Sequence, residues 1–231
     1  MNLLAFDTST EALSVAVRRG AARPCAHEGA GGARASTTLI PVIQELLAHA
    51  GLRLGELDAI VFGRGPGSFT GLRTACSVAQ GLAFGAGTPV LPVDTLLAIA
   101  EEARFAAGFE RVVAVLDARM DEVYWGAYVH EHGAWRREGG IGLGRPESVA
   151  VPPGWVLAGN AFDAYPARLP ADAPRAQVLP TASALLRLAP AMLAAGLAVP
   201  AAGALPLYIR DKVAQTTAER AAARAEPNPR P

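Results

Sequence analysis

Two short acidic turns carry the residue types best suited to chemistry in this chain. The first, Asp7-Thr8-Ser9-Thr10, directly follows an apolar segment. Its hydroxyls and backbone amides could hold a phosphate, and the Asp7 carboxylate could orient a metal-bound water. The alternative is a plain turn between two strands, which Asp and Thr favour. Glu11 favours the plain turn, because it would place a further carboxylate beside a polyanion with no nearby lysine or arginine to offset it.

The second acidic turn, Asp117-Ala118-Arg119, repeats this arrangement in the second half of the chain. It also follows an apolar strand and precedes a β-rich segment. Asp117 could therefore face Asp7 across a cleft between two related lobes, and Gly159-Asn160 could bound an adenosine pocket there. The alternatives are a solvated turn at Asp117 and a common turn pair at Gly159-Asn160.

A glycine-rich segment, residues 63–71, is the most informative stretch of the sequence. It lies between a buried strand and the start of a helix, where free amides and the helix dipole attract anions. Thr70 could cap that helix, and Arg64 and Arg73 flank it. The alternative is a tight turn in which glycine allows close packing. Lys212 is the only lysine, so no standard nucleotide loop ending in Gly-Lys-Ser/Thr exists here. The candidate nucleotide contacts are Asp7, Thr8, Ser9, Gly65, Gly67, Ser68 and Asp117.

Composition and spacing exclude several classes of protein. The 231 residues are 51% hydrophobic and 18% charged, which excludes wholesale disorder. The 21 basic and 21 acidic side chains cancel, which argues against tight nucleic-acid binding by this chain alone. The four histidines and two cysteines have no metal-binding spacing, so we expect no metal site. No secretory signal and no membrane-spanning apolar run is evident, which predicts a soluble cytoplasmic protein.

Hydrophobic periodicity predicts a layered α/β first lobe, residues 1–107. A second, smaller lobe is expected over residues 108–213 and a frayed tail over 214–231. The expected strands cover 3–6, 12–18, 59–62, 90–93, 112–116, 123–129 and 155–158, and the expected helices cover 36–50, 72–84, 95–107 and 182–195.

The helices over 36–50 and 72–84 are almost free of charged residues. A helix packed only on a sheet keeps a polar face, so these two favour a helix–helix surface for a partner protein. The alternative is burial between the lobes. We expect an arginine at Ile43 or Ala79 to abolish partner binding while leaving the fold intact. The positions expected to line this surface are Leu39, Ile43, Leu46, Leu72, Cys76 and Ala79.

Four motifs together resemble the TsaB family, the dimerisation subunits of the bacterial tRNA threonylcarbamoyladenosine synthase. The resemblance covers nearly the whole chain in order, and the glycine-rich motif is its most specific part. The motifs are Leu4-Ala5-Phe6-Asp7-Thr8-Ser9-Thr10-Glu11, residues 63–73, Leu116-Asp117-Ala118-Arg119-Met120 with Val123-Tyr124-Trp125, and Pro206-Leu207-Tyr208-Ile209-Arg210.

The resemblance implies a two-lobed actin-like ATPase (ribonuclease H-like) fold, each lobe a mixed β-sheet flanked by helices. It also implies a non-catalytic subunit that pairs through first-lobe helices with TsaD, the homologous catalytic subunit, and is joined by the small ATPase TsaE. TsaD carries a His-x-x-x-His metal helix and transfers threonylcarbamoyl to N6 of the adenosine next to the anticodon in tRNAs reading codons that start with A.

The chain departs from its catalytic relatives in two places. No histidine stands near Arg34-Ala35-Ser36, where TsaD would carry metal ligands, and Ser9 replaces the glycine of many actin-like ATPases. We therefore expect no turnover by this chain alone, no tightly bound cofactor, tRNA contact only through the complex, and a homodimer when the chain is alone. Weak ATP or ADP binding at the complex interface stays open. The alternative function is an actin-like ATP-dependent phosphotransferase or ATPase that uses Asp7 and Asp117 with magnesium.

Overall fold

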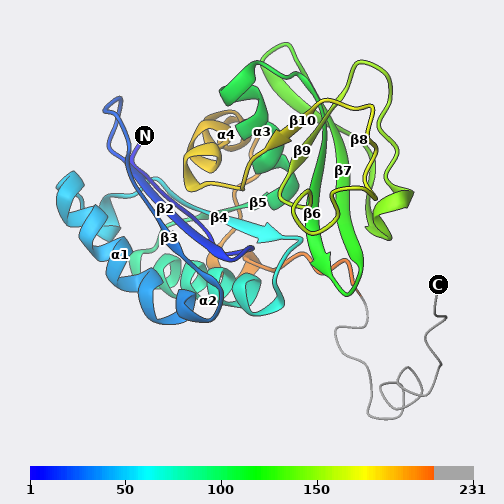
Figure 1. The fold of residues 1–231 in the computed structure, drawn as a ribbon. Helices are drawn as coiled ribbons and strands as arrows, with labels where there is room; N and C mark the ends of the chain where they lie inside the picture. Colours follow the sequence, from blue (N-terminus) through cyan, green and yellow to red (C-terminus); the bar gives the residue numbers. More distant parts are fainter. Residues whose placement is uncertain (211–231) are drawn as a thin grey trace, which may run out of the picture.

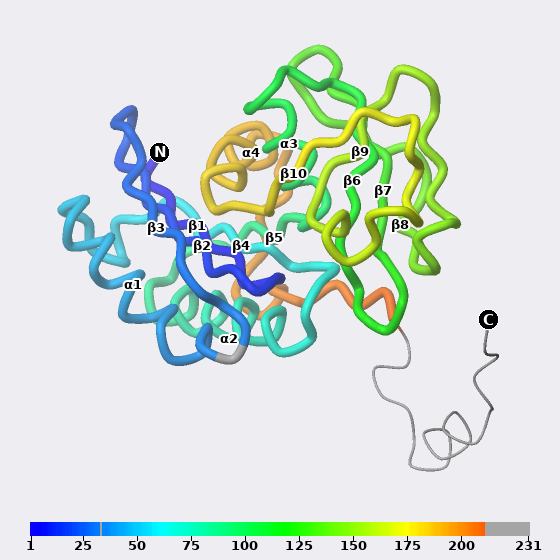
Figure 2. Tube along the Cα trace, in the orientation of Figure 1, coloured from blue at the N-terminus to red at the C-terminus, as the bar shows by residue number. Residues whose placement is uncertain are grey.

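The computed structural model describes residues 1–210, which form two five-stranded β-sheets with helices packed around them (Figures 1 and 2). The predicted tail and residues 211–213 lie outside the described residues. The first sheet has the order β3-β2-β1-β4-β5. Its strands are β1 (Leu3–Asp7), β2 (Ala12–Arg18), β3 (Cys25–Ala30), β4 (Ala59–Gly65) and β5 (Val90–Asp94).

The second sheet repeats the topology of the first. Its order is β10-β9-β6-β7-β8, so β6 takes the central place that β1 has in the first sheet. In both sheets the central strand pairs antiparallel with the next strand in sequence and parallel with the fourth. The duplication predicted from the two acidic turns is therefore confirmed. The strands are β6 (Arg111–Arg119), β7 (Glu122–Glu131), β8 (Ala134–Gly144), β9 (Val156–Gly159) and β10 (Arg175–Gln177).

Every residue of β1 is buried, because helices cover both faces of the first sheet. Helices α1 (Ala35–Ala50) and α2 (Phe69–Ala86) pack on one face, against Leu4 and Phe6. Helix α4 (Ala182–Ala194) packs on the other, against Leu3 and Ala5. The alternation of side chains along β1 thus supplies two separate hydrophobic cores.

Two helices are exchanged between the lobes. Helix α3 (Thr95–Ala107) follows the first sheet in sequence but contributes Leu96 and Ile99 to the core of the second sheet. Helix α4 follows the second sheet but packs on the first, and both helices lie between the sheets in Figure 1. The predicted boundary at residues 107 and 108 falls between α3 and β6, but the two lobes share this interior layer.

A buried ion-pair cluster fixes that shared layer. Glu101 on α3 is 2% exposed. Its carboxylate accepts hydrogen bonds from Arg104 (2.9 Å), from Trp135 Nε1 on β8 (2.9 Å) and from Arg187 Nε on α4 (2.8 Å). One carboxylate therefore connects three elements from both halves of the sequence.

The chain runs from α4 back along the first lobe through a segment that we call the strap, residues 204–210. The Leu207 amide donates to the Arg64 carbonyl oxygen (2.7 Å). The Ala204 carbonyl oxygen accepts from Cys76 Sγ (2.9 Å) and Gln80 Nε2 (2.8 Å) on α2. These contacts fix the strap along the first lobe before it reaches the second.

Strands β3, β8 and β10 were not predicted from the sequence. β3 and β10 are edge strands without apolar alternation, and β8 contains Arg136, Arg137 and four glycines. Helix α2 begins at Phe69 with Ser68 at its N-cap, so the predicted cap by Thr70 is wrong. Short 3-10 helices occur at Gly32–Arg34, Leu54–Glu56, Pro146–Ser148 and Ala201–Gly203. Within residues 1–210, no helix has both the length and the apolar character needed to cross a lipid bilayer.

Candidate functional site

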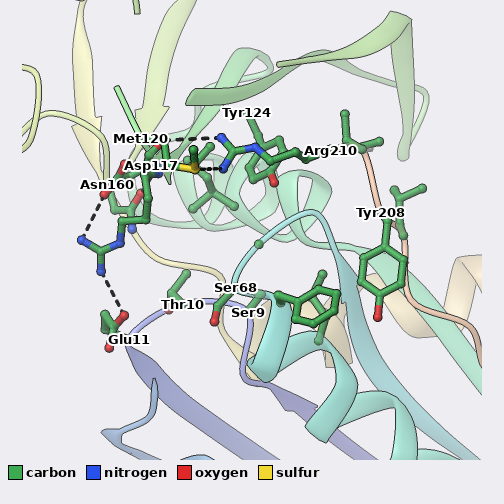
Figure 3. Close-up of a pocket in the computed structure, with 18 residues that line it drawn as sticks. Ser9, Thr10, Glu11, Ser68, Asp117, Met120, Tyr124, Asn160, Tyr208 and Arg210 are labelled. Atoms are coloured by element: carbon green, nitrogen blue, oxygen red, sulfur yellow. Dashed lines mark hydrogen bonds and ion pairs between the residues drawn. The ribbon is translucent and has the colours of Figure 1, made fainter. Parts of the chain in front are cut away.

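A cleft of about 270 Å³ opens between the two lobes (Figure 3). The β1–β2 turn and the start of α2 form its first-lobe wall, the β6–β7 turn forms the opposite wall, and the strap crosses beside them. Its lining residues are Ser9, Thr10, Glu11, Gly67, Ser68, Phe69, Leu72, Leu116, Asp117, Ala118, Arg119, Met120, Tyr124, Asn160, Leu207, Tyr208, Ile209 and Arg210.

Asp7 lies behind this cleft and does not line it. The residue is 1% exposed, and its Oδ1 accepts hydrogen bonds from the Ser9 amide (2.8 Å) and the Ser9 hydroxyl (2.6 Å). Its Oδ2 is buried without a hydrogen-bond partner among the described residues and lies against Gly63. Burial raises the pKa of Asp7 to about 6, although the bonds from Ser9 act in the opposite direction. Ser9 thus separates the candidate acid from the cleft.

The glycine-rich segment packs directly on the β1–β2 turn. The Thr8 hydroxyl donates to the Gly71 carbonyl oxygen (2.7 Å), and the Ser68 amide donates to the Ser9 carbonyl oxygen (2.7 Å). A Cβ at Gly71 would overlap the Thr8 carbonyl, and one at Gly67 would lie 2.5 Å from the Ser9 carbonyl oxygen. These contacts favour the close-packing interpretation of the glycines, since the Ser68 amide already has a protein acceptor.

Only part of the predicted nucleotide set meets in the cleft. Ser9, Gly67, Ser68 and Asp117 line it. Asp7 and Thr8 are buried behind the turn. Gly65, with a φ of 118°, faces Leu72 and the Leu207 carbonyl instead.

Asp117 lines the cleft but already has hydrogen-bond partners within its own lobe. Its Oδ1 accepts from the Arg119 amide (2.8 Å) and from the Tyr165 hydroxyl (3.1 Å). Its Oδ2 lies 3.4 Å from Arg119 Nη1. Asn160 also reaches the cleft, but its Oδ1 accepts from the Asp117 amide (3.0 Å). The hydrogen bond between Asp117 and Asn160 therefore fixes the two residues relative to each other.

An ion pair between Arg119 and Glu11 crosses the cleft. Arg119 Nη2 lies 2.9 Å from Glu11 Oε1, which joins the β6–β7 turn to the β1–β2 turn (Figure 3). The expectation that no arginine offsets Glu11 is therefore wrong. Both side chains are largely exposed, so the pair adds little to stability, but it balances the charge of the cleft.

The β6–β7 turn has an unusual backbone. Arg119, Met120 and Asp121 have φ values of 58°, 55° and 63°, three successive left-handed residues that are not glycine. Arg168 pairs with Asp121, and Arg210 from the strap pairs with Glu122, which holds this conformation. Neither pairing was predicted, because the partners lie far apart in sequence.

The arginines that flank the glycine-rich segment differ in their partners. Arg64 pairs with Asp94 at the end of β5 (2.7 Å). The Arg73 guanidinium lies over the Phe69 ring, with Cζ 3.9 Å from the ring centroid, and its Nε donates to the Tyr208 hydroxyl (3.0 Å). The role of Phe69 and Tyr208 beside the cleft was missed at the sequence level.

The predicted partner-binding positions are wrong as surface residues. Leu39, Ile43, Leu72, Cys76 and Ala79 are at most 6% exposed. Leu46 is partly buried against the core that α1 and α2 form with the first sheet. The apolar stripe of each helix faces its own sheet, so a partner would meet the opposite face.

Within residues 1–210, no three His, Cys, Asp or Glu side chains are grouped so that they could hold a metal ion.

Known proteins similar to this chain agree with this architecture. Residues 31–154 match the family model described as TsaD, tRNA N6-adenosine threonylcarbamoyltransferase. The tRNA threonylcarbamoyladenosine biosynthesis protein TsaB of Escherichia coli is 37% identical, covering 93% of this chain and 96% of that protein. The protein of the same name from Haemophilus influenzae is 48% identical over 57% of this chain and 55% of its own length.

The structure of YeaZ from Pseudomonas aeruginosa superposes with a TM-score of 0.84 at 44% identity, covering 90% of this chain and 99% of that one. Together with the repeated sheet topology, this match confirms the predicted two-lobed, actin-like fold. The cleft, its motifs and the similarity along nearly the whole length agree: this chain belongs to the TsaB family.

Proposed function

We propose that this chain is a non-catalytic subunit in the biosynthesis of tRNA threonylcarbamoyladenosine. It binds and activates the homologous catalytic subunit TsaD, together with the ATPase TsaE, in the cytoplasm. The modified atom is N6 of the adenosine next to the anticodon, in tRNAs that read codons starting with A. The observation that carries this proposal is the similarity to the TsaB of Escherichia coli along nearly the whole of both chains.

The burial of Asp7 and the hydrogen bonds of Asp117 support a non-catalytic role. Asp7 is sealed behind Ser9, and Asp117 is bonded to Arg119 and Tyr165. A catalytic or metal-binding carboxylate needs an oxygen that is free to reach substrate or ion. Asp7 Oδ2, which has no hydrogen-bond partner among residues 1–210, faces Gly63 inside the protein.

The outer face of α2 supports a role in docking a partner helix. Phe84 is 85% exposed there, and Ser77 and Gly81 lie on the same exposed face. A Cβ at Gly81 or Gly85 would meet nothing within 4 Å, so packing within the chain does not require either glycine. A glycine inside a helix costs about 0.5–1 kcal/mol relative to alanine. A partner backbone that approaches closely would account for glycine at these positions.

Helix α1 extends this surface. It lies beside α2 on the same face of the first sheet (Figure 1), and its Ile40 side chain is 43% exposed. The neighbouring Pro41 and Gln44 are also exposed and uncharged. We infer that these faces of α1 and α2 pack against the equivalent helices of TsaD, and against a second copy of this chain when TsaD is absent.

The test is a reconstituted modification assay with unmodified tRNA, TsaD and TsaE, with and without this chain. We expect Gly81→Arg to abolish both stimulation and co-elution with TsaD, because the arginine fills the space that a partner helix would occupy. Ala106→Arg, on the exposed side of α3, is the matched control and should leave both unchanged. Full modification without this chain, or full activity of Gly81→Arg, would contradict the proposal.

The alternative, a magnesium-dependent phosphotransferase, fits the residues poorly. The cleft has room for a small ligand, but Asp7 is not in it, and Arg119 pairs with both Glu11 and Asp117. We expect magnesium and ATP to leave the melting temperature of the isolated chain unchanged. A rise that depends on ATP concentration and disappears in Asp7→Ala would favour the phosphotransferase. Weak ATP or ADP binding at the interface with TsaD would involve Ser9, Gly67, Ser68 and Asp117.

A further inference from the structure

Phe69, Arg73 and Tyr208 form an exposed cluster on the rim of the cleft, which we call the aromatic platform. The Phe69 and Tyr208 rings lie 5.4 Å apart between centroids and are tilted by 35°. Phe69 is 36% exposed and Tyr208 is 44% exposed. The Arg73 guanidinium covers the Phe69 ring and donates to the Tyr208 hydroxyl. Two aromatic rings and a cation thus meet solvent together.

Arg73 differs from the other arginines around the cleft. Arg64, Arg119 and Arg210 each pair with a carboxylate, whereas Arg73 makes no ion pair within residues 1–210. Its only hydrogen bond there uses Nε, so both terminal amino groups of the guanidinium are available to a ligand. An anion at this position would therefore find a donor that is already oriented.

The elements that carry the platform have no acidic residue. Residues 69–86 and the strap contain two arginines and no Asp or Glu. The platform also lies at the N-terminal turn of α2, where the helix dipole favours negative charge. Arg210 is already paired with Glu122, so Arg73 supplies the positive charge of these two elements that suits an anionic ligand.

We propose that the aromatic platform binds an unpaired nucleotide of RNA. The base stacks on the exposed ring of Tyr208, and its phosphate binds the terminal amino groups of Arg73. Stacking on aromatic rings and on arginine planes is the usual way in which proteins hold splayed-out bases. The identity of the RNA as tRNA rests on the proposed function, but the binding chemistry does not.

The strap that carries Tyr208 is anchored on both sides of this residue. The Leu207 amide anchors the strap on one side of Tyr208, and the Arg210 side chain anchors it on the other side by pairing with Glu122. Binding then orders few protein side chains, which favours affinity.

The test measures fluorescence anisotropy of the full chain with a labelled single-stranded oligoadenylate and with an unmodified tRNA transcript. We expect Arg73→Ala and Tyr208→Ala to weaken binding of both by roughly tenfold. Tyr208→Phe keeps the ring and should retain most of the affinity. Arg73→Ala should also lower the slope of log affinity against log salt by about one. Arg23→Ala, which removes an exposed arginine on the first lobe away from the cleft, is the matched control.

Four outcomes overturn the inference. The first is no RNA binding by the native chain, and the second is an equal loss of RNA affinity in Arg73→Ala and Arg23→Ala. The third is AMP binding as tight as that of the RNA. The fourth is that platform variants weaken TsaD binding while leaving RNA binding intact. The last, measured separately by co-elution with TsaD, would assign the platform to a protein interface. Because the binding assay contains neither TsaD nor the modification reaction, a chain that binds RNA through Arg73 but does not stimulate modification would refute only the proposed function.

Discussion

Replacing Asp7 by asparagine should make the protein more stable at neutral pH. The carboxyl is 1% exposed, and burial raises its pKa from 3.8 to about 6. The folded state therefore holds the Asp7 proton more tightly than the unfolded state does. The stabilisation that this proton gives is complete below about pH 3.8, falls as the pH rises, and is gone above about pH 6.

The size of the effect follows from the pKa. At about 1.36 kcal/mol for each pKa unit, ionised Asp7 costs the folded state up to about 3 kcal/mol above pH 6. Asparagine has nearly the same shape and never ionises. Its Oδ1 keeps the two hydrogen bonds from Ser9, and its amide can donate toward Thr95, which lies close enough to be one of the weaker influences on the pKa of Asp7. We expect a gain of about 1–3 kcal/mol at neutral pH and almost none near pH 4.

The measurement is urea unfolding of the native chain and Asp7→Asn, at several pH values between about 4 and about 8. Asp7→Ala is the comparison, because it also removes the charge but loses the bonds to Ser9 and leaves a cavity. It should be less stable than Asp7→Asn at every pH. If Asp7→Asn and the native chain have the same stability across this range, or if asparagine destabilises the protein at neutral pH, burial does not dominate the pKa of Asp7.

Three further predictions concern the core and the helix surfaces. Burial alone would raise the pKa of Glu101, but the bonds from Arg104, Trp135 and Arg187 lower it below its ordinary value of 4.5. The stability that ionised Glu101 contributes is therefore present above that pH and is lost as the pH falls. Glu101→Gln should lower the free energy of unfolding by about 3 kcal/mol at neutral pH and by less in acid, as measured by urea unfolding. Because Ile43 is buried in the core, the expectation that an arginine there leaves the fold intact is wrong: Ile43→Arg should abolish the folded state seen by circular dichroism, whereas Ile43→Val should lower the free energy of unfolding by only about 1 kcal/mol. Gly81→Ala should raise the thermal stability of the isolated chain by up to about 1 kcal/mol, and an unchanged or lower melting temperature would mean that the glycine is needed within the fold.

Much of the secondary structure could be read from local patterns. The apolar run of β1, the alternation in β2 and the helical spacing of α1 and α3 depend on neighbours within one or two turns of the chain. The duplication was also readable, because the same succession of strand, acid and strand occurs at Asp7 and Asp117. Edge strand β3 escaped prediction because an edge strand needs no buried face.

The local sequence of a helix did not show what covers its apolar face. The spacing of Leu39 and Ile43 shows one apolar face on α1, but it does not say whether a partner or the chain's own sheet covers that face. The sheet covers it, so the residues expected at an interface form the core instead. The surface that remains for a partner consists of small or uncharged residues, which carry little signal in a sequence.

The sequence by itself determined most of the elements, the repeated lobes and the family, because these depend on short-range periodicity and on contiguous motifs. The tertiary structure decided which groups meet. The pairs Glu11–Arg119 and Arg73–Tyr208 join residues that are 108 and 135 positions apart. It also decided that Ser9 seals Asp7 from the cleft. Such contacts depend on how helices and sheets pack and on what water is excluded, and no spacing along the chain encodes that packing directly.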